Sequence, residues 1–297
     1  GLLEREDSMQ NRMIRGLIIA VMIAGITLYV SHEKDKEREQ RQRETTKNRI
    51  FAEYDPEKVL DLELRRSGTE NIVVKKEKDG WNLKHPVHAR ADLTTVNRML
   101  NVLAKQSASS YSFSEVNDLG RLGLAPGKEA AMLFLGDYKV AISTEVDPIK
   151  NLRYIGFNKR IYLVEDDFFY FLVSGYPSFI NRLILPEEKD IAAIETNKFI
   201  ITKGENSWET TPYIKPGQLE LLFANWKKAF SERVSLLKKD RKIDEAQYIK
   251  IELEGEERSR LFFIVKDKEK LILINRRLGI EYYLPLKLEK ELLPDYV

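Results

Sequence analysis

Apolar residues recur with two different spacings along this chain, and the spacings predict strands in some stretches and helices in others. Apolar and polar residues alternate, or form short apolar runs, in stretches typical of strands. These stretches are 59–63, 72–76, 131–135, 140–143, 161–164, 191–195, 199–203, 248–253, 261–265 and 281–284. Residues 93–104 and 218–230 instead carry apolar residues three and four positions apart, which predicts an amphipathic helix in each. Antiparallel strands with packed helices make an α+β fold.

The predicted elements occur twice in the same order, which indicates a duplicated unit. In each half, two strand-like stretches lead to a tryptophan beside a turn, then a proline, then the helix. Trp81 and Pro86 precede the first helix, and Trp208 and Pro212 precede the second. We expect each repeat to be an antiparallel sheet with one helix on a face. The two α+β repeats are expected at 55–188 and 189–297.

Particular side chains are predicted to stabilise the repeats. Asp92 is a suitable N-cap for the first helix, because its carboxylate can accept hydrogen bonds from free amides of the first turn. Trp81 and Trp208 fit core positions better than ligand-stacking positions, since each lies at a strand end beside a turn. The apolar stripes expected to face the sheets are Leu93, Val96, Leu100 and Leu103 in the first helix and Leu219, Leu222, Phe223, Trp226 and Phe230 in the second.

An uncharged stretch, 16–30, follows a short tail, 1–15, and predicts a single transmembrane helix. At about 1.5 Å per residue it spans roughly 22 Å, and Arg15 can extend it by reaching back to the headgroups. A cleaved signal peptide has a similar composition, but no pair of small residues marks a cleavage site after Val30. We therefore expect an uncleaved anchor in the lipid bilayer.

Small residues on one face of this predicted helix suggest a helix partner. Gly16, Ala20 and Ala24 recur every four residues, and small residues at that spacing let a second helix approach closely. The orientation of the anchor stays open, because basic residues lie on both sides of it and long domains translocate largely regardless of flanking charge.

The stretch 31–54 is almost wholly charged or amide-bearing up to Arg49 and predicts a solvated helical stalk. Glu37 with Arg41 and Glu39 with Arg43 stand four residues apart, acid first, which favours a helix. A polybasic lipid-binding patch is the alternative. The interspersed acids dilute the basic charge, so we favour the stalk.

Composition excludes several classes of function. The chain has 297 residues, a net charge of +2 and no cysteine. Such a balanced charge provides no field for capturing nucleic acid, so no nucleic-acid partner is expected. Without cysteine there is no disulfide, thiolate metal site or cysteine nucleophile.

The sequence also contains no recognisable catalytic constellation. It has neither a phosphate-binding glycine loop nor a Gly-x-Ser-x-Gly nucleophile motif. His85, His88 and Asp92 could bind a metal in principle, but Pro86 separates the histidines and no second cluster supports a site. We expect no catalytic residue, no cofactor, no metal and no small-molecule substrate.

Two sets of aromatic residues are candidate contact surfaces. The segment with Phe168, Phe169, Tyr170, Phe171 and Tyr176 is the most apolar part of the body. It predicts either a buried helix joining the two halves or a surface for a partner. The tyrosines that could contact a polysaccharide or peptidoglycan are Tyr111, Tyr154, Tyr213 and Tyr248.

Four motifs give the chain a resemblance to a known family. They are Gly80-Trp81-x-Leu83-x-x-Pro86, Arg90-Ala91-Asp92 opening a helix, Leu122-Gly123-Leu124-x-Pro126, and Tyr162-Leu163-Val164. Over about residues 55–240 the chain resembles the bacterial DUF4340 family. The resemblance implies a single-pass inner-membrane protein with a periplasmic body, in a genetic neighbourhood of ABC-type transporter components related to those of gliding motility. It implies no catalytic residues.

These observations lead to one expected function and two rivals. The leading hypothesis is a non-enzymatic, membrane-anchored accessory or scaffold subunit that binds other membrane proteins of an inner-membrane complex. The first rival is an envelope module that binds polysaccharide or peptidoglycan. The second is a hydrolase using carboxylates without a recognisable motif, which would require a concave pocket with perturbed acids.

Overall fold

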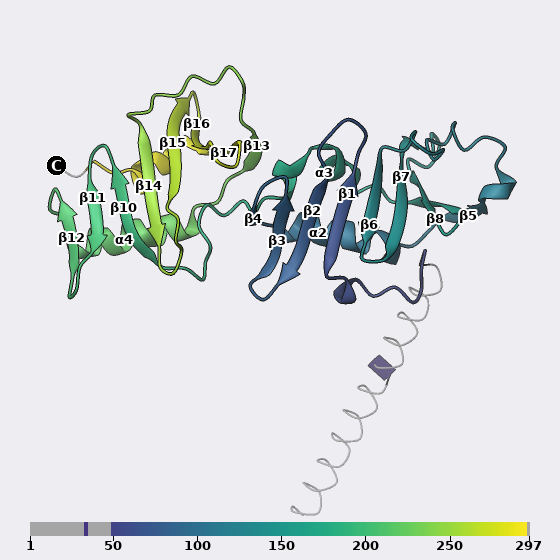
Figure 1. The fold of residues 1–297 in the computed structure, drawn as a ribbon, viewed down its shortest axis with the longest axis horizontal. Helices are drawn as coiled ribbons and strands as arrows, with labels where there is room; N and C mark the ends of the chain where they lie inside the picture. Colours follow the sequence, from purple (N-terminus) through teal and green to yellow (C-terminus); the bar gives the residue numbers. More distant parts are fainter. Residues whose placement is uncertain (1–32, 35–48, 296–297) are drawn as a thin grey trace, which may run out of the picture.

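The computed structural model describes residues 33–34 and 49–295 (Figure 1). The predicted tail, the transmembrane segment with Gly16, Ala20 and Ala24, and most of the predicted stalk lie outside these residues. Within the two described ranges, no helix is long and apolar enough to cross a membrane.

The first unit is built on a nine-stranded antiparallel sheet in the order β4-β3-β2-β1-β6-β7-β8-β9-β5. Successive side chains of a strand point to opposite faces of the sheet, and one face of this sheet is covered. In β6, for example, every second residue is therefore buried. The strands are β1 (Asp61–Arg65), β2 (Ile72–Glu77), β3 (Gly80–His85), β4 (Ala89–Arg90), β5 (Ser109–Ser112), β6 (Ala131–Leu135), β7 (Tyr138–Val146), β8 (Arg153–Phe157) and β9 (Arg160–Val164).

The second unit is built on an eight-stranded antiparallel sheet in the order β12-β11-β10-β14-β15-β16-β17-β13. Apart from the two-residue β4, this order matches the first sheet strand for strand. The strands are β10 (Ile191–Thr196), β11 (Ile200–Lys203), β12 (Trp208–Thr211), β13 (Arg233–Leu236), β14 (Tyr248–Leu253), β15 (Arg260–Asp267), β16 (Lys270–Asn275) and β17 (Ile280–Pro285). The sheet-rich fold, with two antiparallel sheets and few helices, is confirmed and is compatible with a duplicated strand unit.

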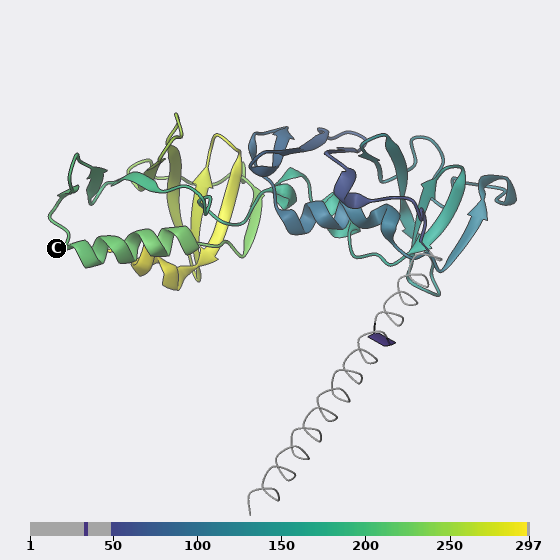
Figure 2. The same cartoon turned by 90° about the horizontal axis from the view of Figure 1, so that it is seen from below.

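Each sheet carries one longer helix on a face, and Figure 2 shows both helices on the same side of the molecule. In each unit the helix follows the strand at one edge of the sheet, β4 or β12, and leads to the strand at the opposite edge, β5 or β13. The α-helices are α2 (Leu93–Leu100), α3 (Phe169–Val173), α4 (Pro216–Lys228) and α5 (Glu289–Leu292). The 3-10 helices are η1 (Pro56–Lys58), η2 (Asn101–Ala104), η3 (Phe113–Glu115), η4 (Tyr176–Phe179) and η5 (Leu286–Leu288).

The first predicted helix is found as α2 followed directly by η2. Asp92 is confirmed as its N-cap, because its Oδ1 accepts a hydrogen bond from Thr95 N at 2.9 Å. Leu93 does not join the buried stripe: as the first helical residue it stands at the end of the element and is 56% exposed. Phe230 lies beyond the end of α4, under the guanidinium of Arg182 at 4.5 Å.

The core runs along the helix-covered faces of both sheets. Trp81 is buried in the first unit and Trp226 is fully buried in the second, where its indole Nε1 donates to Leu292 O at 2.9 Å. Trp208 is half-buried with its ring 4.7 Å from that of Phe223. Burial of these large rings removes apolar area from water at about 25 cal/mol per Å².

A short linker, residues 180–190, joins the units and is hydrogen-bonded to both. On the first-unit side, Asn181 N donates to Arg90 O at 2.9 Å. On the second-unit side, Ile184 N donates to Ala229 O at 3.0 Å. The hydroxyl of Tyr176 also crosses the junction and donates to Leu278 O at 2.9 Å. These bonds hold the β4 edge of the first sheet next to the β16–β17 turn of the second sheet.

Candidate functional site

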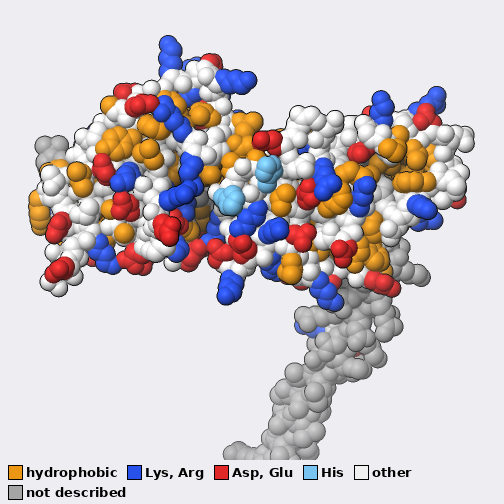
Figure 3. All heavy atoms as spheres, in the orientation of Figure 1, with side chains coloured by type: hydrophobic (Ala, Val, Ile, Leu, Met, Phe, Trp, Pro, Cys, Tyr) orange, Lys and Arg blue, Asp and Glu red, His pale blue; other side chains and the backbone are white. Residues whose placement is uncertain are grey.

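A cleft of about 360 Å³ lies where the two units meet. Its walls come from three parts of the chain: the β3–β4 edge of the first sheet, the linker, and the beginning of β15 with the β16–β17 hairpin of the second sheet. Figure 3 shows histidine side chains and several Lys and Arg side chains gathered at this junction. A volume of this size is typical of a ligand site.

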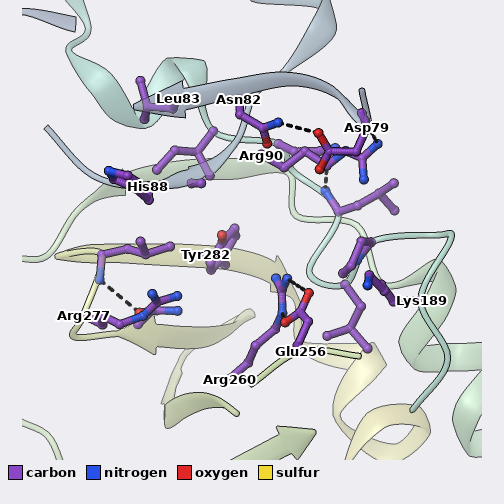
Figure 4. Close-up of a pocket in the computed structure, with 18 of the residues that line it drawn as sticks. Asp79, Asn82, Leu83, His88, Arg90, Lys189, Glu256, Arg260, Arg277 and Tyr282 are labelled. Atoms are coloured by element: carbon purple, nitrogen blue, oxygen red, sulfur yellow. Dashed lines mark hydrogen bonds and ion pairs between the residues drawn. The ribbon is translucent and has the colours of Figure 1, made fainter. Parts of the chain in front are cut away.

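The first-unit wall of the cleft is fixed by ion pairs and hydrogen bonds (Figure 4). The guanidinium of Arg90 pairs with the carboxylate of Glu188 in the linker and donates to Asp79 O at 2.7 Å. Asn82 Nδ2 donates to Asp79 Oδ1 at 2.9 Å. Lys84 Nζ lies 2.6 Å from Glu77 Oε2. The acids of this wall therefore already have partners.

The second-unit wall leaves polar groups open to the cleft. Arg260 pairs with Glu256 through Nε and Nη2, at 3.3 and 2.9 Å. Arg277 lies in the exposed turn between β16 and β17 and, among the described residues, its side chain has no hydrogen bond or ion pair. The turn itself is closed by a bond from Leu278 N to Asn275 Oδ1 at 3.0 Å, which holds Arg277 at the rim.

Tyr282 lies at the floor of the cleft. Its side chain is only 5% exposed, and its ring packs edge-on against Phe262 with the centroids 6.1 Å apart. No group among the described residues forms a hydrogen bond with its hydroxyl. Burial raises the pKa of Tyr282 to about 12, against the opposing effect of the Arg260 and Arg277 charges. Both guanidinium groups therefore act electrostatically on this hydroxyl.

Not every charged side chain that lines the cleft has a partner. Five basic side chains and four carboxylates line it, and each carboxylate accepts a hydrogen bond from a neighbour. Lys189 and Arg277 have no carboxylate partner within the described ranges. The charged side chains of the lining that lack an ion-pair partner are thus both cations, which suits an anionic ligand.

The three residues considered as a metal site do not converge. His88 lines the cleft, whereas Asp92 caps α2 and has Oδ2 3.9 Å from Arg182 Nε. His85 is exposed at the end of β3. Across residues 33–34 and 49–295, no group of three His, Asp or Glu side chains comes together in a geometry that could hold a metal.

The predicted structural-motif residues lie in the two units rather than in the cleft. Pro86 and Pro212 follow β3 and β12, each after a cis peptide bond, and Trp81 and Trp208 lie in those strands. Gly123 has a positive φ of 61°, and a Cβ there would lie 2.8 Å from Ser143 Oγ and 3.2 Å from Thr144 N. Glycine is therefore required there by both backbone conformation and space.

The aromatic segment proposed as a partner surface is mostly packed inward. Phe168 is fully buried in the core, with Lys105 beside its ring. The ring centroid of Phe169 lies 3.4 Å from the guanidinium carbon of Arg153. Phe171 and Tyr176 are half-buried, and Tyr170 is 69% exposed. Of the five rings only Tyr170 is largely available to a partner.

Sequence reasoning missed the residues that define the cleft. It considered His88 only as a metal ligand, and it placed Tyr282 only within a predicted strand. The one local signal was Arg276-Arg277 ahead of Gly279, which indicates a charged hairpin turn. Nothing local connects that turn to β4 or to the linker.

Comparison with protein-family models, with curated proteins and with solved structures finds no match for this chain. The resemblance to the DUF4340 family therefore stays a prediction.

Proposed function

We propose that this protein is a non-enzymatic, membrane-anchored accessory subunit of an inner-membrane complex, and that its two-unit body binds a protein partner through the cleft between the units. The observation that carries this proposal is the make-up of the cleft. Its walls are held by internal ion pairs, while Tyr282, Arg277 and Lys189 keep open donors. Such a surface is suited to binding.

The membrane part of the proposal rests on the sequence. The uncharged stretch 16–30 followed by the charged stretch 31–49 supports an anchor and stalk. The DUF4340 resemblance supports a periplasmic body and an association with ABC-type transporter components. The finer reading of the fold, a duplicated unit with one packed helix per copy, is supported by the common strand order of the two sheets.

Co-purification tests the proposal. The full chain, extracted in mild detergent with a C-terminal tag, is expected to retain one or more membrane proteins in stoichiometric amount. A strictly monomeric, partner-free chain after extraction in several detergents would refute the proposal.

Topology is tested separately. A reporter active only outside the cytoplasm, fused after Val297, is expected to be active, and its cytoplasmic counterpart inactive. The reverse pattern would move the body, and the search for partners, to the cytoplasm.

A second candidate function is binding of cell-wall polysaccharide through exposed tyrosines. Tyr213 is 78% exposed and Tyr111 lies at the surface on edge strand β5. Tyr154 and Tyr248 are half-buried, with their hydroxyls on Asp147 and Glu195. A pull-down on purified cell-wall material is expected to retain the wild type and lose the Tyr213→Ala variant if this function holds. Equal recovery with and without the cell wall would remove it.

A further inference from the structure

The floor of the cleft contains a tyrosine, Tyr282, whose ring is buried and whose hydroxyl has no hydrogen-bond partner among the described residues. The Tyr282 residue is only 5% exposed, and its hydroxyl is not among the fully buried unpartnered atoms, so this oxygen is the part of the side chain that opens to the cleft. The hydroxyl of Tyr282 borders the cavity, and Figure 4 shows its oxygen pointing into the space between the two walls. A ligand group in the cleft would supply the missing bond.

The charges around this hydroxyl select the ligand. Arg277 at the rim has no carboxylate partner, and Arg260 uses Nε and Nη2 on Glu256, which leaves Nη1. The charges of both arginines act on Tyr282. A cationic ligand would be repelled by these guanidinium groups, whereas an anionic ligand would both accept their hydrogen bonds and offset their charge.

We propose that the cleft holds a carboxylate of an acidic polypeptide segment, which accepts hydrogen bonds from the Tyr282 hydroxyl and the Arg277 guanidinium. This inference rests on the proposed function and names the chemistry of the partner. Charge-assisted bonds to a carboxylate are about twice as strong as neutral ones, and guanidinium geometry matches two carboxylate oxygens. The apolar residues Leu83, Ile180 and Phe262 lie behind the lining and are at most 2% exposed, so the polar donors supply the contacts.

The carboxylates already in the cleft do not compete for this place. Glu188 is held by Arg90 and Glu256 by Arg260, and both ion pairs lie on the walls. Asp79 accepts from Asn82. The site is therefore formed before the ligand arrives, and little reorganisation is needed on binding.

Fluorescence anisotropy on the full chain in detergent tests the proposal. The probe is a fluorescein-labelled Gly-Ala-Asp-Glu peptide, and the comparison probe is its Asn/Gln analogue with an amidated C-terminus. The acidic peptide is expected to bind at least tenfold more tightly than the amide. Arg277→Gln is expected to weaken binding about tenfold and Tyr282→Phe about fivefold, as each removes a bond to a charged group.

Arg276→Gln is the matched control, because Arg276 is the adjacent residue but pairs with Glu245 at 2.7 Å and stacks on Phe263, outside the cleft. It is expected to leave peptide binding unchanged. Equal affinity for the acidic and amide peptides, no binding of either, or equal losses in the Arg276 and Arg277 variants would overturn the proposal. So would displacement of the peptide by inorganic phosphate at the same concentration, which would identify a site for phosphate instead.

The same variants separate this inference from the proposed function. If partners co-purify with the wild type but are lost from Arg277→Gln and Tyr282→Phe, both stand. If partners co-purify equally with all variants, the accessory role stands and the assignment of the cleft fails. If the acidic peptide binds as expected but no partner ever co-purifies, the site stands and the accessory role fails.

Discussion

The two units share a strand order, yet each buries the opposite half of an ion pair. In the first unit the buried member is a cation, Arg153, whose guanidinium binds Asp166 at 2.7 Å and donates to Ser143 O. In the second it is an anion, Glu281, fully buried on β17 and held by Arg241 at 2.8 and 2.9 Å. The same sheet topology therefore tolerates different polar chemistry.

The two ion pairs differ in the segment that each holds to its sheet. Arg241 belongs to the connection between β13 and β14, and Glu281 also accepts bonds from Lys238 N and the Tyr283 hydroxyl. This connection covers a small second core that contains Phe263, Ile272 and Ile274. Arg153 instead joins β8 to the segment leading into α3, and stacks on Phe169. Arg241 and Glu281 thus tie the long connection 237–247 to its sheet, whereas Arg153 and Asp166 tie down the short segment 165–168.

The largest expected effect is that of Arg241→Met. It leaves the Glu281 carboxylate buried with only the Lys238 amide and the Tyr283 hydroxyl as donors, so we expect a loss of about 3 kcal/mol, at the low end for a broken buried pair. The chain has three tryptophans, of which only Trp81 lies in the first unit. Urea unfolding followed by fluorescence in a Trp81→Phe background therefore reports on the second unit.

The double variant Arg241→Met with Glu281→Gln serves as the control for this prediction. It removes the unpaired charge and is expected to recover most of the lost stability, because a neutral amide costs less to bury than a carboxylate. A double variant as unstable as the single one would mean that the arginine acts through packing alone.

A smaller loss is expected for Arg153→Met in the first unit. The side chain of Asp166 is 19% exposed and keeps contact with water, and one of its oxygens also accepts from Phe169 N. We expect a loss of about 1–2 kcal/mol, measured by urea unfolding in the presence of Trp81. A loss larger than that of Arg241→Met would reverse the comparison between the units.

Alternation predicted several of the half-buried strands, and two of the strands that it missed have an identifiable physical reason. β6 and β14 were predicted at their observed bounds, because alternation marks a half-buried strand. β5 has one apolar residue among serines, and pairing with β9 makes it a strand. β16 is buried on both faces, so its continuous apolar run carries no alternation.

The cleft could not be predicted for a different reason. Its defining residues come from β3–β4, the linker and the β16–β17 turn, which are far apart in sequence. Tyr282 has an ordinary strand context, and only the long-range bonds of the linker and of Tyr176 bring the units into the position that leaves its hydroxyl facing a cavity. Local periodicity contains no such information.

Two glycines of the first unit differ in the space around them. Gly123 and Gly127 both have positive φ, 61° and 78°, but only at Gly123 would a Cβ meet other atoms. We expect Gly127→Ala to cost about 1 kcal/mol for the backbone conformation alone and Gly123→Ala about 1 kcal/mol more. Equal midpoints of urea unfolding for the two variants would show that Ser143 and Thr144 move aside without cost.

The last expected effect is a pH dependence carried by Glu281. Its bonds to Arg241 and Tyr283 lower its pKa below the ordinary value despite burial, which acts in the opposite direction. A carboxylate with a lowered folded-state pKa contributes stability above its unfolded-state pKa of about 4.3, and that stability is lost as the pH falls through the folded-state value. We therefore expect the free energy of unfolding of the second unit to fall in acid. Glu281 alone contributes at most about 1.4 kcal/mol per pH unit to this fall.

Glu281→Gln separates this contribution from those of other acids. The variant is expected to be less stable than wild type at neutral pH and to lose less stability between neutral pH and acid, measured by urea midpoints in the Trp81→Phe background. Parallel pH profiles for wild type and Glu281→Gln would mean that the buried carboxylate does not couple proton binding to folding, and that the two ion pairs differ only in what they fasten.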